Sequence, residues 1–454
     1  MKLYNPSNGE IFREVAEDSS TQVKSKFELL KSYQPKWLDT KLKDRISCIQ
    51  QFFELLEGEK DQLAADLSLE VGKPIWQSLN EVNGAKARIQ FFIENSEKYL
   101  MDEWVTPEGN TREKISYEPL GVIGNISAWN YPYLVGVNVF IPALIAGNSV
   151  LYKPSEFSTL TGMNIDRLLK KAGIPDGAFQ LVVGAREAGE AMLDLPLNGY
   201  FFTGSFKTGK YIYERVAPKM VPCQLELGGK DPLYVADDVA DIKQVAEAVL
   251  EGVVYNTGQS CCAVERVYVQ EGIYDSFLEE FVQQAKQLKV GGNEDGKMDV
   301  GPLTRKDQVD FLVGQVKDAV EKGATLLVGG KKMERKGYFF EPTVLSNVNH
   351  EMSVMKEESF GPIIGIQKVK DDMEATALML DSEYGLTAAV YTTNQERAEK
   401  IMKQMNSGTV YWNCCDRVSA PLPWSGRKHS GIGSTLSPIG IRAFTHPKAY
   451  HLRG

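Results

Sequence analysis

A chain of 454 residues is long enough to bury a large hydrophobic core and to form two or three domains. With 43% hydrophobic and 24% charged residues, it has the composition of an ordinary soluble globular protein. The formal net charge of -9 argues against nucleic acid or an anionic membrane as the main partner.

Cysteine usage and the N-terminal residues favour a cytoplasmic protein. The stretch from Met1 to Gly9 has no apolar core and does not resemble a signal peptide. Six cysteines, among them two adjacent pairs, do not form the pattern of a disulfide framework and suit a reducing compartment. No charged residue occurs between Glu118 and Lys153, but prolines and asparagines interrupt this stretch, which therefore predicts buried strands and a helix and no membrane span.

The first half of the chain begins with helices and continues with strands that alternate with helices. Residues 42–56 carry apolar side chains at helical spacing, and residues 111–117 alternate as an exposed hairpin strand does. Predicted strands then follow at 122–126, 150–153, 179–183 and 200–203, with a helix at 160–172 among them. This alternation predicts a parallel sheet, whose ligands bind beyond the carboxyl ends of its strands.

A second block of mixed strands and helices follows Gly229. It has predicted strands at 267–269, 325–328 and 387–392, and predicted helices at 245–255, 277–288, 312–322 and 395–405. Residues 445–453 are expected to form a terminal strand. The fold class is therefore predicted to be α/β.

Two adjacent thiols, Cys261 and Cys262, follow Gly258, Gln259 and Ser260 at a predicted helix-to-strand junction. Free cysteines are commonly small buried hydrophobic residues. A cysteine in a loop fixed by its two neighbouring elements is also well placed to act as a nucleophile. The thiols alone leave both interpretations open.

Polar residues at the ends of predicted strands suggest a dinucleotide site. Lys153, Ser155 and Glu156 follow one strand and could bind ribose hydroxyls, although a solvated loop is the alternative. Gly204 and Ser205 follow another strand and open a helix, where free backbone N–H groups bind a diphosphate.

Two further residues have the chemistry of acyl transfer. Glu226 lies in an apolar strand, where burial raises the pKa of a carboxyl and suits it to act as a general base; a solvent-facing edge strand is the alternative. Asn130 could donate its amide to an oxyanion, or simply form a turn. The four histidines lack metal-ligand spacing, so no metal site is predicted.

Seven motifs, taken together, resemble those of the aldehyde dehydrogenase superfamily in order and approximate spacing. They are Trp129-Asn130-Tyr131-Pro132, Lys153-Pro154-Ser155-Glu156, Phe202-Thr203-Gly204-Ser205, Glu226-Leu227-Gly228-Gly229-Lys230, Gly258-Gln259-Ser260-Cys261, Glu357-Glu358-Ser359-Phe360-Gly361-Pro362 and Pro423-Trp424-Ser425-Gly426-Arg427-Lys428. The resemblance implies a Rossmann-type cofactor domain (1–100 and 120–228), an α/β catalytic domain (229–428), and an oligomerisation hairpin and tail (101–119 and 445–454). It also implies a homodimer or homotetramer.

The resemblance assigns roles to residues. It selects Cys261 as the nucleophile, Glu226 as the base that activates water, and Asn130 as the oxyanion donor. The residues that match cofactor contacts are Trp129, Lys153, Ser155, Glu156, Gly204, Ser205, Glu358 and Phe360.

The implied reaction is NAD-dependent oxidation of a small-molecule aldehyde to the carboxylic acid, through a cysteine thiohemiacetal and a thioester. NAD is expected to be preferred over NADP, because the carboxylate of Glu156 would repel a 2′-phosphate. The alternatives are a CoA-acylating relative, which Glu226 disfavours, and a catalytically silent structural or binding protein on this scaffold.

The substrate is left open between ω-functional and aliphatic aldehydes. Tyr131 and Trp424 resemble two walls of the aromatic box that betaine-aldehyde members use. Asn138 stands where the third wall is usually tryptophan, and where some succinate-semialdehyde members carry arginine. Arg417 could anchor a carboxylate or be a solvated loop residue.

Ser260 is expected to line the same pocket, and Cys262 is expected to line either this pocket or the core. Cys262 could also resolve an oxidised Cys261 or form a vicinal disulfide with it. Residues 433–437 depart from the Gly-Arg-Glu-Leu-Gly that family members often have, which puts an arginine-based tether there in doubt.

Overall fold

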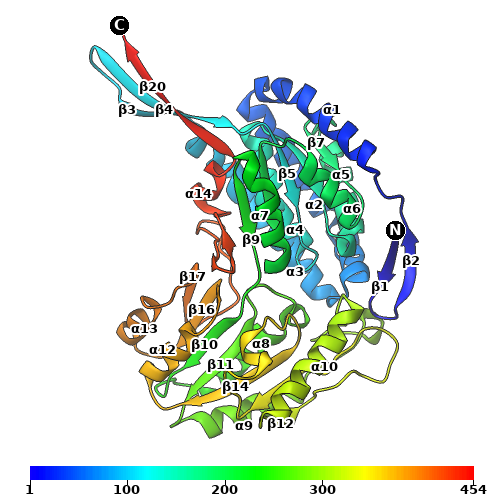
Figure 1. The fold of residues 1–454 in the computed structure, drawn as a ribbon, viewed down its shortest axis with the longest axis vertical. Coiled ribbons are helices and arrows are strands. Elements are labelled where there is room, and N and C mark those ends of the chain that lie inside the picture. The colour runs from blue at the N-terminus through cyan, green and yellow to red at the C-terminus, as the bar shows by residue number, and fades with distance from the viewer.

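The computed structural model describes residues 1–293 and 295–454. They form two large sheets, each covered by helices, and a projecting third sheet (Figure 1). The chain begins with a short hairpin and three helices: β1 (Lys2–Asn5), β2 (Glu10–Glu14), α1 (Ser20–Asp39), α2 (Leu42–Val71) and α3 (Ile75–Leu100). Ser19 begins α1 with a capping box, and α2 ends at Gly72, whose φ of 89° is left-handed. Pro74 then starts α3 in a new direction.

The first large sheet has six strands in the order β19-β9-β8-β5-β6-β7. All neighbours run parallel except β19 and β9, which are antiparallel. Its strands are β5 (Val122–Ile126), β6 (Ser149–Lys153), β7 (Phe179–Leu181), β8 (Gly199–Thr203), β9 (Cys223–Glu226) and β19 (Gly431–Ile432). The connecting helices are α4 (Pro132–Ala146), η1 (Glu156–Ser158), α5 (Thr159–Lys171), α6 (Arg186–Asp194), α7 (Phe206–Val216) and η2 (Ala217–Lys219).

Successive side chains of these strands enter two different cores. Ile123 and Phe201 pack with α2, α3, α4 and α5, whereas Val122 and Phe202 pack with α1, α6 and α7. A strand places consecutive side chains on opposite faces, so a run that is apolar throughout requires helices on both faces. This covering leaves the carboxyl ends of the strands as the place for a ligand.

The second large sheet has seven strands in the order β12-β13-β14-β11-β10-β16-β17. They are β10 (Asp231–Val235), β11 (Val264–Gln270), β12 (Thr325–Val328), β13 (Thr343–Ser346), β14 (Ile363–Val369), β16 (Thr387–Tyr391) and β17 (Thr409–Trp412). Its helices are α8 (Ile242–Val254), η3 (Tyr255–Gly258), α9 (Tyr274–Ala285), η4 (Asn293–Asp295), α10 (Lys306–Glu321), α11 (Ser353–Lys356), α12 (Asp372–Leu380) and α13 (Gln395–Met402). Two short strands, β15 (Tyr384–Gly385) and β18 (Arg427–Lys428), pair apart from it.

A three-stranded antiparallel sheet extends away from the two large sheets and their helices (Figure 1). It consists of β3 (Glu103–Thr106), β4 (Thr111–Pro119) and the C-terminal strand β20 (Thr445–Arg453), which follows α14 (Ser437–Arg442). Residue Arg453 pairs with Thr111, so the two distant segments run together along their whole length.

The α/β fold class is confirmed, and the predicted strands at 122–126, 150–153 and 200–203 correspond to β5, β6 and β8. The parallel sheet predicted for the first block is confirmed, with β19 added as an antiparallel edge strand, and β12 is an antiparallel edge strand of the second sheet. The helix expected at 245–255 begins earlier, at Ile242, and ends at Val254. Within the described residues, no helix combines the length and the apolarity that crossing a membrane requires.

Candidate active site

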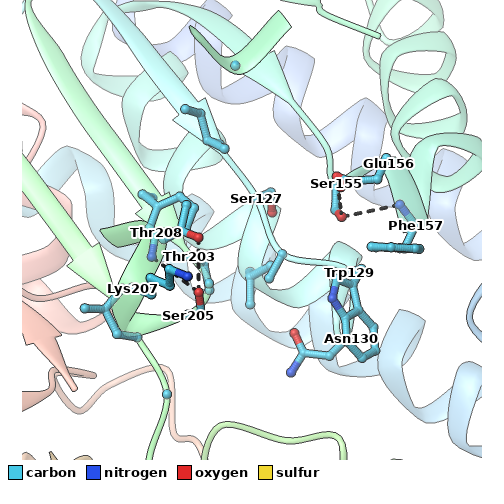
Figure 2. Close-up of a pocket in the computed structure, with 18 of the residues that line it drawn as sticks. Ser127, Trp129, Asn130, Ser155, Glu156, Phe157, Thr203, Ser205, Lys207 and Thr208 are labelled. Carbon is cyan, nitrogen blue, oxygen red and sulfur yellow. Dashed lines mark hydrogen bonds between the residues drawn. The ribbon is translucent and has the colours of Figure 1, made fainter. Parts of the chain in front are cut away.

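A cavity of about 780 Å³ lies beyond the carboxyl ends of β5, β6, β8 and β9. Figure 2 shows side chains at and after the ends of β5, β6 and β8 around it. Twelve of the predicted site residues line it: Trp129, Asn130, Tyr131, Lys153, Ser155, Glu156, Gly204, Ser205, Glu226, Cys261, Glu358 and Phe360. The other five predicted residues are not among its lining residues: Asn138, Ser260, Cys262, Arg417 and Trp424.

The thiol turn between α8 and β11 has an unusual backbone. Asn256 and Thr257 have φ values of 53° and 60°, and a β-branched residue with positive φ is a genuine outlier. The turn is held by side chains, since Asn256 Nδ2 donates to Gln259 O at 2.9 Å and Thr257 Oγ1 accepts from Gly301 N at 3.1 Å. This rigid turn fixes Cys261 at the cavity wall.

The second thiol has a different environment. Cys262 is buried, and its Sγ donates to Asp416 Oδ1 at 2.9 Å. The hydrogen bond with Cys261 and burial raise the pKa of the Cys262 thiol well above its usual range. Burial also raises the pKa of Asp416, to about 6. Cys262 is thus held as a neutral donor, while Cys261 is the thiol that reaches the cavity.

Glu226 ends β9 inside the sheet, between β8 and β19, and its residue is 8% exposed. Its Oε1 accepts from Thr435 Oγ1 at 3.2 Å and from Gln224 Nε2 at 3.4 Å. Oε2 is buried and has no hydrogen-bond partner in the described part of the chain. Burial raises the pKa of this carboxyl to about 8. The side chain is therefore a buried carboxyl with one oxygen free for water, and the solvent-facing alternative is excluded.

Asn130 lies at the turn that precedes α4. Its Nδ2 donates to Gln259 O at 3.1 Å, which links this turn to the thiol turn and uses one of two amide hydrogens. Its backbone carbonyl accepts from Lys73 Nζ at 2.7 Å and from Asn256 Nδ2 at 3.0 Å. The second amide hydrogen is left for an oxyanion in the cavity.

Lys73 belongs to a buried ion pair that sequence reasoning missed. Its Nζ contacts Glu81 Oε2, and both side chains are fully buried. Glu81 Oε1 also accepts from Tyr133 N at 2.9 Å. The ion pair therefore bonds the backbone of the Asn130 turn at two points, Asn130 O through Lys73 and Tyr133 N through Glu81. No sequence signal indicates this, because Lys73 and Asn130 are far apart along the chain.

On one side of the cavity, strand ends carry polar side chains suited to a dinucleotide. Lys153 is buried, has no ion-pair partner among the described residues, and donates only to Pro154 O at 3.2 Å. Ser155 Oγ donates to Glu156 Oε2 at 3.2 Å, as Figure 2 shows. Ser205 caps α7, where it accepts from Thr208 N at 3.4 Å. A buried lysine without a carboxylate and a helix N-terminus both fit hydroxyl and phosphate groups.

Glu358 and Phe360 also line the cavity and are held by the loop between α11 and β14. Glu358 Oε1 accepts from Gly229 N at 3.0 Å, and burial raises the pKa of this carboxyl to about 8. A Cβ at Gly228 would lie 2.2 Å from Glu358 Oε1, so this approach requires glycine. The Phe360 ring meets Trp129 edge to face at 5.5 Å.

A second buried ion pair anchors this loop. Ser359 N and Phe360 N donate to Glu265 at 2.8 and 2.9 Å, and Glu265 pairs with Lys230 at 2.5 Å. Lys230 stands in a recognised motif, but its partner in β11 could not be read from the sequence. The pair sets the height of Glu358 and Phe360 over the cavity.

Of the residues expected to bind substrate, Tyr131 lines the cavity and the others lie elsewhere. The Tyr131 ring lies 4.0 Å from Lys73 Nζ, and Trp424 packs in the hydrophobic core. Ser260 and Cys262 face Asp416. The Arg417 side chain is exposed, whereas Asn138 is buried and contacts Arg88, a residue that sequence reasoning did not single out.

This arrangement can perform nucleophilic addition followed by base-assisted hydrolysis. It holds a thiol, an amide donor and a buried carboxyl of raised pKa beside a cavity with the features of a dinucleotide site. Among the described residues, no group of three or more His, Cys, Asp or Glu side chains could hold a metal ion.

Comparison with known proteins gives consistent matches along the chain. The model of the aldehyde dehydrogenase family matches residues 1–450. A betaine aldehyde dehydrogenase of Bacillus subtilis is 33% identical over 411 residues, which cover 89% of this chain and 84% of that protein. An NADP(+) succinate-semialdehyde dehydrogenase of Escherichia coli is 32% identical over 446 residues, which cover 98% of this chain and 92% of that protein. The solved betaine aldehyde dehydrogenase of Staphylococcus aureus with NAD⁺ has a TM-score of 0.96 at 30% identity, covering 100% of this chain and 92% of that chain.

Proposed function

The chain belongs to the aldehyde dehydrogenase family, and from this premise we propose that it oxidises an aldehyde to the free carboxylic acid with Cys261 as nucleophile. The observation that carries the proposal is Glu226, a cavity-lining carboxyl whose Oε2 has no partner in the described part of the chain. Such a carboxyl suits a base that takes a proton from water. A CoA-acylating reaction has no use for it.

The first half of the reaction is acylation. The Cys261 thiolate adds to the aldehyde carbon, and the carbonyl oxygen becomes an alkoxide that accepts from the free Nδ2 hydrogen of Asn130 and the Cys261 backbone N–H. Bound NAD(P)⁺ supplies the hydride acceptor. Loss of hydride leaves a thioester on Cys261 Sγ.

The second half is hydrolysis of this thioester. Glu226 takes a proton from water, the resulting hydroxide adds to the thioester carbon, and the Cys261 thiolate departs to release the acid. Lys73 and Asn256 hold the Asn130 turn in place through both steps. Thr435 and Gln224 orient the Glu226 carboxyl so that Oε2 stays free.

An aldehyde panel read at the NADH absorbance band tests this function. We expect NADH and free acid in equal amounts, with no increase in rate and no acyl-CoA when CoA is added. Production of acyl-CoA would favour the acylating alternative, and absence of NADH with every aldehyde would favour a silent scaffold. Cys261→Ala should lose NADH formation and keep cofactor binding.

NAD is proposed as the preferred cofactor over NADP. Glu156 begins η1, three residues after β6 ends at Lys153, and a carboxylate near the ribose 2′ position repels a phosphate there. The relatives differ on this point, since the named cofactor is NADP(+) for the Escherichia coli protein and NAD⁺ for the Staphylococcus aureus structure. The preference therefore rests on Glu156 alone.

We also propose a homodimer or homotetramer assembled through the projecting sheet, and the three domains described above. Trp104 and Val105 of β3 are exposed, and β20 lies at a sheet edge, where unpaired backbone groups invite another strand. Light scattering after gel filtration tests the assembly.

A cytoplasmic location is proposed because the reaction needs Cys261 as a free thiol.

A further inference from the structure

Arg88 is a buried cation of α3 whose charge has no carboxylate partner. Its residue is 9% exposed, and no ion pair to it occurs within residues 1–293 and 295–454. Two buried lysines near the site, Lys73 and Lys230, each pair with a glutamate, whereas the unpaired Lys153 belongs to the proposed cofactor side.

Two other buried arginines, Arg45 and Arg266, also lack an ion pair among the described residues, but they donate to several backbone carbonyls. Because a buried charge is normally paired or fully hydrogen-bonded, the free donors of Arg88 point to an anion that the protein itself does not supply.

The hydrogen bonds of Arg88 leave one edge of its guanidinium free. Nη1 donates to Leu134 O at 3.2 Å and to Asn138 Oδ1 at 3.1 Å, which uses both of its hydrogens. Nε and Nη2 have no partner among the described residues. The N–H groups of Nε and Nη2 are parallel and form the edge that grips a carboxylate with two hydrogen bonds.

This free edge is reached by solvent. Nε and Nη2 of Arg88 have no hydrogen-bond partner in the described part of the chain, yet they are not fully buried and keep some solvent-accessible surface. By contrast, Arg266 is fully buried and bonds protein oxygens through all three of its nitrogens. A structural arginine of this fold thus fills its donors, and Arg88 does not.

Asn138 adds a donor at the same place. Arg88 has only donors, so Asn138 must present its Oδ1 to Arg88 and turn its Nδ2 away. This amide nitrogen has no partner in the described chain and is not sealed, although the residue is only 5% exposed. Arg88 and Asn138 together therefore offer an anion five N–H donors without protein partners.

Hydrogen bonds hold Arg88 to α4, the helix that begins shortly after the turn of Asn130. Burial lowers the pKa of Arg88 to about 10, and Cys262, Glu81, Cys261 and Glu226 partly offset this. Three of these four belong to the thiol turn and the proposed base. Leu134 lies in the first turn of α4 and Asn138 in the second, so an anion at the free edge of Arg88 lies near the turn that carries the proposed oxyanion donor.

We propose that Arg88, oriented by Asn138, binds the distal carboxylate of the substrate, so that the enzyme acts on short aldehydes that carry a second, anionic end. This inference rests on the proposed function and deepens it. The same positive charge disfavours aldehydes with a quaternary ammonium group. Arg417, whose side chain is exposed, is not needed for this role.

The test compares kcat/KM for succinate semialdehyde, butanal and betaine aldehyde, which represent anionic, neutral and cationic substrates. For the wild type we expect succinate semialdehyde to exceed butanal by at least about 30-fold, the scale for losing one partner of a buried charge pair. Arg88→Met should abolish this preference, mainly through a higher KM. Arg88→Lys should restore part of it, because the charge returns without the fork.

Arg45→Met is the matched control. Arg45 is also a buried arginine, but it bonds backbone carbonyls such as Ile145 O through Nε and Leu38 O through Nη1. It should lower stability and leave the ratio of the two kcat/KM values unchanged. A purely structural role of Arg88 would give the same result in Arg88→Met, and that result overturns the inference.

Inhibition provides a second readout if Arg88→Met does not fold. Succinate should compete with the aldehyde in the wild type far better than neutral succinamide does, and less well in Arg88→Lys. Equal inhibition by both compounds contradicts the inference. Oxidation of butanal without preference for the anion refutes only the anchor, whereas no NADH from any aldehyde refutes the proposed function itself.

Discussion

Glu226→Gln separates the two halves of the proposed reaction. Burial raises the pKa of Glu226 from 4.5 to about 8. With that value, roughly one tenth of the enzyme has the ionised base at pH 7 and about one hundredth at pH 6. Thioester hydrolysis in the wild type should therefore rise about tenfold per pH unit in this range and level off above pH 8 or so.

The variant keeps the shape of the side chain and loses the base. We expect hydrolysis to slow by about 10² to 10⁴-fold, the usual contribution of a general base. Hydride loss precedes the step that needs Glu226, so one equivalent of NADH should still form in a rapid first phase. Stopped-flow absorbance at the NADH band measures both phases across pH.

Glu70→Gln is the control for this experiment. Glu70 is another buried carboxyl whose pKa burial raises to about 8, but it accepts backbone N–H groups of Leu160 and Thr161 at the start of α5. It should leave the pH profile of the steady-state rate unchanged. A lost first phase in Glu226→Gln, or a persistent pH slope in its slow phase, would refute the assignment of Glu226 to hydrolysis.

Four further outcomes follow from the same geometry. Glu156→Gln should raise the kcat/KM ratio of NADP to NAD by about tenfold or more, and an unchanged ratio contradicts the proposed repulsion. Gly228→Ala should weaken NAD⁺ binding, measured by tryptophan fluorescence. The new Cβ would lie only 2.2 Å from Glu358 Oε1 and would push this carboxylate out of its place. Asn130→Ala should lower kcat by about 10² to 10³-fold without a matching loss of NAD⁺ affinity. The pKa of Glu226 is raised in the folded state, so its burial costs least stability at low pH and the wild type loses stability as the pH rises through about 8. Glu226→Gln does not titrate and should lack this loss. In urea titrations, the unfolding free energy of the variant minus that of the wild type should therefore be larger at pH 9 than at pH 5, by no more than about 5 kcal/mol.

Much of the site's location could be predicted, because parallel strands end at one edge of a sheet. Lys153 and Glu226 end two apolar strands, Ser205 follows a third, and all three residues line one cavity. The pattern does not fix the direction of an edge strand, since such a strand has one neighbour and pairs either way. This is why β12 and β19 were not foreseen as antiparallel.

The supporting contacts could not be predicted, because they join residues that are distant in sequence. Arg88 meets Asn138 only because α3 packs on α4, and a helical pattern shows which face is buried but not what it faces. Thr435, which bonds Glu226, lies in the segment where the chain departs from the family pattern. The two ion pairs beneath Asn130 and Glu358 are invisible for the same reason.

The central claim is that Cys261 carries the acyl group and Glu226 releases it. Mass spectrometry of Glu226→Gln, quenched after reaction with NAD⁺ and an aldehyde, tests this directly. We predict a thioester adduct on the peptide that contains both thiols, located on Cys261 by fragmentation and absent from Cys261→Ala. An adduct on Cys262, or NADH formation with no trapped acyl group, would contradict the account.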